Sequence, residues 1–160
     1  MGESRQQPAA SAMAILHLLA LAARWALVPI ACYVGFHLAI VPGLVTHERI
    51  RYWCPWGDPE LVAAIRAGES VECPVPGWFD HVTYFATAGL AAVAVVMFGA
   101  LAAPVKRPWL PWAVCCTGCV VASWMTIRLP SHALHALFAC AAGAVAAAAT
   151  SRRIQRRMTG

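Results

Sequence analysis

Long runs of apolar residues, separated by short charged patches, dominate the pattern of this chain. Four runs are long enough to form helices that cross a bilayer, because such a helix needs about 20 mostly apolar residues. We place the spans at residues 12–42, 82–103, 109–127 and 131–150, and the last three contain no charged residue. The pattern therefore predicts an all-α polytopic membrane protein, a single domain in which four transmembrane helices form a compact bundle.

The first apolar run is too long for one simple span, and it contains Arg24. Two arrangements fit it. Either one long tilted helix runs from about residue 9 to residue 42, or the span begins at Trp25 and residues 9–23 lie at the membrane interface. We favour the long helix, with Arg24 reaching toward the headgroups, because an Arg near the interface costs little.

The charged residues between the spans indicate which side of the membrane each segment faces. The termini and the turn at residues 106–107 hold seven Lys or Arg and one Glu, whereas residues 47–81 hold three Arg and six Asp or Glu. Because Lys and Arg near span ends favour the cytoplasm, we expect both termini inside and the acidic loop outside. A signal peptide cleaved near Ala22 is the alternative. It would place the acidic loop in the cytoplasm, against this charge distribution.

The acidic outer loop carries the signals of a short helix between two cysteines. Asp58 suits the N-cap, Pro59 suits the first helical position, and Gly68 suits a left-handed residue at the helix end. Cys54 and Cys73 flank this helix, and an oxidising compartment favours a disulfide between them. We expect a structural disulfide that contributes about 3 kcal/mol. A redox-active pair is the alternative.

Five further cysteines lie inside the predicted spans. Cys116 and Cys119 form a C-x-x-C pattern in the third span, and Cys32 lies at a similar depth from the cytoplasmic face. If these three thiols meet, they suit Cu(I) or another thiophilic metal. We name them as a candidate metal or redox group. The alternative is that they are small apolar residues at helix contacts.

The predicted plan resembles that of the disulfide-forming quinone reductases, which include the vitamin K epoxide reductase family. The resemblance rests on the number of spans and on the outer pair Cys54 and Cys73. In those proteins the active C-x-x-C opens toward the outer side. Here Cys116 and Cys119 lie near the cytoplasmic side, so we carry over no catalytic role.

Five of the six histidines fall in the outer half of the predicted bundle. His132 and His135 share one helix face, and His37 lies within the bilayer, where an imidazole needs a partner or a wet cavity. We name these three as candidate haem or metal ligands, without a complete ligand motif such as H-E-x-x-H. The alternative is a set of interfacial polar residues, with Asp80 and Ser131 as helix N-caps.

Small residues recur at four-residue spacing in the second and fourth spans, in the rows Ala88, Ala92, Val96 and Ala139, Gly143, Ala147. Such rows let helices approach closely, either within the bundle or against a partner. Because we find no complete catalytic motif, we expect a non-catalytic accessory or scaffold subunit of a larger complex, with no cofactor. A thiol or metal redox protein and a haem or metal binder are the alternatives.

The expected partners are the lipid bilayer and either another membrane protein or a second copy of the chain. The four arginines among residues 152–157 follow a span directly, so we assign them to topology and to anionic lipid headgroups rather than to nucleic acid. The chain is rich in Ala and Arg, as is typical of GC-rich bacteria. We therefore expect a bacterial inner membrane.

Overall fold

The computed structural model describes residues 7–69, 71–104 and 107–159. Its elements are α1 (Gln7–Trp53), α2 (Pro59–Arg66), α3 (Gly77–Ala102), α4 (Leu110–Arg128), the 3-10 helix η1 (Pro130–His132) and α5 (Ala133–Thr159), with no strand among these residues. Helices α1, α3, α4 and the η1–α5 segment are long and apolar enough to cross a bilayer. The chain is an all-α, multi-pass membrane protein, and the predicted fold class is confirmed. Glu3, Arg5 and Lys106, which enter the charge count, lie outside the described residues.

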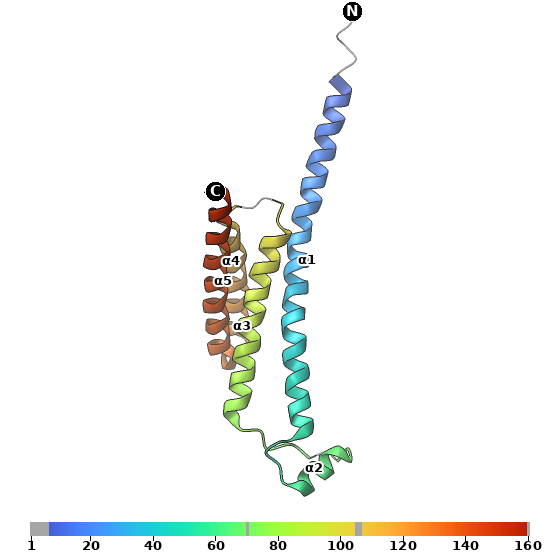
Figure 1. Cartoon of the computed structure of the whole chain (residues 1–160), viewed down its shortest axis with the longest axis vertical. Helices are drawn as coiled ribbons and strands as arrows, with labels where there is room; N and C mark the ends of the chain where they lie inside the picture. The colour runs from blue at the N-terminus through green and yellow to red at the C-terminus, as the bar shows by residue number, and fades with distance from the viewer. Residues whose placement is uncertain (1–6, 70, 105–106, 160) are drawn as a thin grey trace, which may run out of the picture.

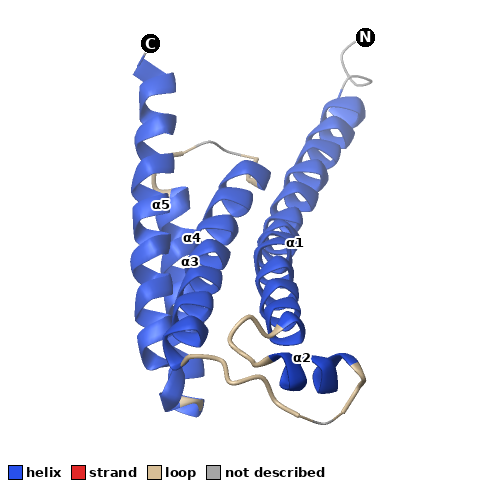
Figure 2. Ribbon diagram, turned by 60° about the horizontal axis from the view of Figure 1, so that its bottom comes forward, coloured by secondary structure: helices blue, strands red, loops and turns tan. Residues whose placement is uncertain are grey.

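Helix α3 occupies the centre of the arrangement. It contacts α1 on one side and both α4 and α5 on the other, whereas α1 contacts neither α4 nor α5 in the described residues. Figure 2 shows α1 beside the other three long helices, with α2 next to its last turns. The first turn of α1 and the last turn of α5 lie at one end of the molecule, the terminal end, and α2 lies at the other, the loop end (Figure 1).

Helix α1 is one continuous helix of 47 residues that passes through Pro29 and Pro42. At about 1.5 Å per residue it is about 70 Å long, and its N-terminal part extends past the other helices (Figure 1). Its continuity agrees with the long helix favoured from the sequence. It also runs on to Trp53, well beyond residue 42.

Glycines on α1 bring its backbone close to α3. A Cβ atom on Gly35 would lie 3.1 Å from the carbonyl oxygen of Ala94, and one on Gly43 would lie 2.8 Å from Cγ2 of Thr87. Close approach at small residues is how helices commonly associate in membranes. Together with His47, these glycines form a row at multiples of four residues. This row was not among the small-residue rows predicted from the sequence.

A second contact region lies between α3, α4 and α5. Its buried core consists of Val96, Cys115, Ala146 and Ala147. A Cβ atom on Gly143 would lie 3.7 Å from Cβ of Ala92 and 4.0 Å from Cγ2 of Val96. The two small-residue rows predicted from the sequence therefore meet each other inside the bundle.

Candidate functional site at the loop end

The loop between α1 and α3 is organised by α2 and by one disulfide. Asp58 caps α2, accepting a hydrogen bond of 2.8 Å from the backbone N–H of Leu61, and Gly68 follows the helix with φ of +83°. Cys54 is buried and bonded to Cys73, with Cα atoms 5.5 Å apart. The predicted loop helix is confirmed, and the structure supports the predicted disulfide.

Aromatic side chains join this loop to the start of α3. The ring centroid of Trp56 lies 5.2 Å from that of Phe79 and 6.3 Å from that of Trp78. Phe79 in turn stacks on His47 of α1, at 6.0 Å between centroids. Because these rings come from α1, the loop and α3, they hold the three segments in contact.

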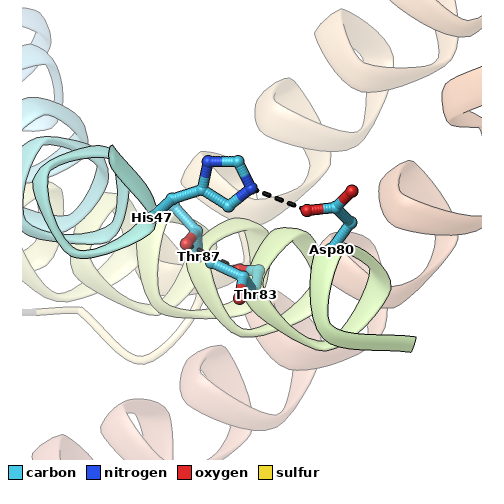
Figure 3. A network of polar contacts seen from close by, with 4 residues as sticks. All are labelled: His47, Asp80, Thr83 and Thr87. Atoms are coloured by element: carbon cyan, nitrogen blue, oxygen red, sulfur yellow. Dashed lines mark hydrogen bonds and ion pairs between the residues drawn. The ribbon is translucent and has the colours of Figure 1, made fainter. Parts of the chain in front are cut away.

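A polar pair links α1 to the first turns of α3. Nε2 of His47 lies 2.7 Å from Oδ1 of Asp80, and the His47 side chain is buried (Figure 3). Farther along the interface, the hydroxyl of Thr87 donates a hydrogen bond to the carbonyl of Thr83, within its own helix. The His47–Asp80 contact is the only ion pair that the described residues show.

The helix starts near these residues differ from the expected ones. Helix α3 begins at Gly77 with Pro76 at the N-cap position, so the prediction that Asp80 caps it is wrong. Asp80 lies inside the first turns, where its carboxylate meets His47 instead. Ser131 likewise lies inside η1, whose N-cap position is Leu129. In both cases the helical turn begins earlier, at a proline or directly after one, where the missing N–H costs no helix hydrogen bond.

A second histidine group surrounds His135 on α5. Its ring centroid lies 5.6 Å from that of His132 and 6.3 Å from that of His81 on α3. Phe85 stacks on the same ring at 4.5 Å. Both ring nitrogens of His135 are buried and have no hydrogen-bond partner in the structure. A buried polar atom without a partner is uncommon and costs free energy.

One tyrosine lies between the two histidine groups. The ring centroid of Tyr84 is 5.6 Å from that of His47 and 5.9 Å from that of His135. Residues from α1, α3, η1 and α5 thus gather around the first two turns of α3. We call His47, His81, His132 and His135 the loop-end histidines.

His37 does not belong to this group. Its side chain is exposed on α1, and its Nδ1 lies 3.0 Å from the carbonyl oxygen of Tyr33 in the preceding turn. Of the candidate ligands His37, His132 and His135, the structure brings together only the last two. Gly35 faces α3. His37 follows it by two residues, which turn a helix by about 200°, so the His37 side chain points away from α3. No group of three His, Cys, Asp or Glu side chains in the described residues could hold a metal ion.

The structure does not bring Cys32 and Cys116 together. The thiol of Cys32 lies against α3, where it donates a hydrogen bond of 3.6 Å to the carbonyl oxygen of Val95. The side chain of Cys116 is exposed on α4, and α1 and α4 are not neighbouring helices in the described part of the chain. Cys32 is therefore used in the packing of α1 on α3.

Cys119, the third candidate thiol, lies near two cysteines that were not predicted to be site residues. It packs against the core that contains Cys115, and its thiol neighbours those of both Cys115 and Cys140. Cys115 and Cys119 are four residues apart, which places them on one face of α4. That spacing was the available signal, whereas the C-x-x-C pattern pointed to Cys116 on a different face.

One concavity under the loop is lined by a mixture of acidic, basic and apolar side chains. A cavity of about 280 Å³ is lined by Glu48, Arg51, Tyr52, Ile65, Val71, Glu72 and Cys73. Its charged groups are two acids, Glu48 and Glu72, and one base, Arg51. Comparisons of the chain with protein-family models, with curated proteins and with solved structures find no match.

Proposed function

We propose that this protein is a non-catalytic accessory or scaffold subunit of a larger complex in a bacterial inner membrane. The observation that carries the proposal is the N-terminal part of α1. From residue 13 to residue 30 its side chains are exposed, except for the half-buried Leu21 and Val28. Helix α1 contacts α2 and α3 alone among the described elements. This apolar stretch is therefore available to contact another membrane protein.

The length of α1 favours a protein partner over lipid alone. Helix α3, with 26 residues, is about 39 Å long and suffices to cross a hydrocarbon core of about 30 Å. Helix α1 is nearly twice as long and projects past α3 at the terminal end (Figure 1). The projecting part cannot lie at the interface as an amphipathic helix does, because His17 is the only polar residue between positions 13 and 23. A helix that is apolar on every face is normally surrounded by lipid or by other protein.

The proposed orientation places the terminal end in the cytoplasm and the loop end outside. The last turns of α5 lie at the terminal end (Figure 1), and they carry the arginines at positions 152, 153, 156 and 157, which supports this orientation. The acidic loop and its disulfide lie at the opposite end. Disulfides form and persist in oxidising compartments, which agrees with a loop end that lies outside the cytoplasm.

The scaffold proposal is tested by purifying the full chain from membranes in native lipid nanodiscs. We expect a complex larger than the 17.1 kDa of one chain. Leu16→Ala combined with Leu19→Ala should release the partner. Leu134→Ala combined with Leu137→Ala on α5 is the matched control, because the four leucines have similar exposure, between 61% and 68%. Extraction of single chains, or equal release by both pairs of substitutions, would contradict the proposal.

A thiol redox or metal protein is the second candidate function, favoured by the position of Cys119 between Cys115 and Cys140. Thiol trapping in intact cells followed by peptide mass spectrometry separates it from the scaffold. The scaffold proposal requires Cys54–Cys73 to stay oxidised and the thiols on α4 and α5 to stay reduced under all growth conditions. Cycling of the α4 and α5 thiols, or their protection by bound metal, would support the redox or metal function instead.

A further inference from the structure

Two neighbouring concavities open on the last turns of α1. The first is the cavity of about 280 Å³ under the loop, which we call the loop cavity. The second is a more open groove of about 640 Å³, and its lining residues all belong to α1: Leu44, Val45, Glu48, Arg49, Tyr52 and Trp53. Glu48 and Tyr52 line both concavities. The charged loop cavity therefore continues into a groove whose walls are mainly aliphatic and aromatic.

The charged side chains of the loop cavity have no ion-pair partner within the described residues, where the one ion pair joins His47 to Asp80. Glu48 and Glu72 are acids, and Arg51 is a base. A ligand that carries an amine and an anion in one small group would satisfy both kinds of charge. An ammonium donates hydrogen bonds to carboxylates, and a guanidinium donates to a phosphate. The loop cavity thus matches a zwitterion better than a simple anion or cation.

The depth of the two concavities matches that of phospholipid headgroups. Glu48 directly follows the residue that pairs with Asp80, and Asp80 is the last charged residue before the uncharged residues 82–102 of α3. Glu48 therefore lies level with the edge of the hydrocarbon core. At 1.5 Å per residue, Arg51 lies about 4.5 Å farther from the core and Leu44 about 6 Å nearer to it. Headgroups occupy about 5–7 Å beyond the core on each side.

We infer that the loop cavity and the groove bind one phospholipid with an ethanolamine headgroup. The ammonium meets Glu48 and Glu72, the phosphate meets Arg51, and one acyl chain follows the groove past Leu44 toward the core. An ammonium with three N–H donors suits the two carboxylates better than a choline group, which has none and which proteins enclose in aromatic side chains. A glycerol headgroup would offer its phosphate to Arg51 but would leave both carboxylates without a cation.

The bound lipid would connect α1 to the loop that follows it. Glu48 and Arg51 belong to α1, whereas Glu72 directly precedes Cys73 of the disulfide. A ligand that binds only the folded chain stabilises it, so the lipid would add to the contacts that hold the loop end. The site is independent of the proposed scaffold role, because it shares no residue with the exposed N-terminal part of α1.

The test is native mass spectrometry of the full chain in detergent, with one class of lipid added at a time. The probes are phosphatidylethanolamine, phosphatidylglycerol and phosphatidylcholine with identical acyl chains. We expect one phosphatidylethanolamine per chain, bound about fivefold more tightly than either other lipid, since an exposed ion pair contributes a factor of up to about five. The inference is overturned if the wild-type chain retains no lipid, or if it binds the three lipids equally.

Substitutions distinguish the two charged groups of the headgroup. Glu48→Gln and Glu72→Gln should each weaken phosphatidylethanolamine binding by about two- to fivefold, without weakening phosphatidylglycerol binding. Arg51→Gln should weaken the binding of both lipids, because both carry a phosphate. All three side chains are exposed, so folding should survive these substitutions. Equal weakening of both lipids by the two glutamate substitutions would contradict the assignment of the ammonium to the carboxylates.

Glu69→Gln is the matched control for the glutamate substitutions. Glu69 is an exposed acid of the same loop, and it lines neither the loop cavity nor the groove. The substitution removes the same charge and should leave the affinity for phosphatidylethanolamine unchanged. If Glu69→Gln weakens this binding as much as Glu72→Gln does, the lipid responds to the overall charge of the loop, and the inferred site is wrong.

Discussion

The two ends of α1 belong to one helix but differ sharply in how they are held. The end near the loop carries Gly43 against Thr87, His47 against Asp80, and Cys54 in a disulfide directly after the helix. The stretch from residue 13 to residue 30 is more apolar, yet almost all of it is exposed. In a bilayer, apolar surface gains little by leaving lipid, and contacts depend on close packing and polar pairs. The more polar end is therefore the fixed one.

Loss of the disulfide should weaken the fixed end most. Cys54→Ser should lower the free energy of unfolding by about 3 kcal/mol, because the closed loop restrains the unfolded chain. The measurement is reversible unfolding in mixed micelles, with and without reductant. Cys116→Ser, at an exposed free thiol, is the control and should have little effect. If reductant destabilises the wild type and the Cys54→Ser variant equally, the disulfide does not fix this end.

A side chain at Gly43 should be the next most harmful change. Gly43→Leu places a bulky group against Thr87 and should cost about 1–3 kcal/mol, as overpacking commonly does. Gly118→Leu is the matched control, because a Cβ atom on Gly118 would meet no atom of the described residues within 4 Å beyond its own helical turn. Thr87→Ala should restore part of the stability lost in Gly43→Leu. If Gly43→Leu and Gly118→Leu lose equal amounts of stability, the close approach of α1 and α3 at Gly43 does not stabilise the fold.

Removal of the polar pair should have a smaller effect. In a double-mutant cycle, His47→Ala and Asp80→Ala should show a coupling free energy of about 0.6 kcal/mol, and at most about 1.7 kcal/mol, the range for such contacts in membrane proteins. The same micelle unfolding experiment measures it. His37→Ala should show no coupling with Asp80→Ala. A coupling of zero for His47 would remove this pair from the list of contacts that fix α1.

Changes in the exposed part of α1 should have the smallest effect on the isolated chain. Leu16→Ala and Leu19→Ala should shift its free energy of unfolding by no more than about 0.5 kcal/mol, because both side chains are exposed. The same substitutions should release the partner in native membranes. A large loss of stability in the isolated chain would show that this stretch packs against the bundle, and the comparison between the two ends would fail.

Local signals explain which parts of the site could be predicted. Asp58 and Gly68 act on their own helix within a few residues, and Cys54 and Cys73 were the only cysteines outside the spans. Asp80 was misassigned as an N-cap because its partner, His47, lies 33 residues away in the sequence. The row of Gly35, Gly43 and His47 was readable from its spacing. The helix that this row faces could not be predicted, because the spacing of residues does not indicate which helix packs against them.

The sequence by itself determined four apolar helices, the helix within the acidic loop and the separation of the acidic loop from the basic ends, because these depend on composition and on neighbours along the chain. The tertiary structure alone decided which faces meet. It placed His81 with His132 and His135 and left His37 outside, and it placed Cys119 with Cys115 and Cys140 rather than with Cys32. The reason is geometric. Each residue turns a helix by about 100°, so the rotation of each helix against its neighbour selects the side chains that share a site.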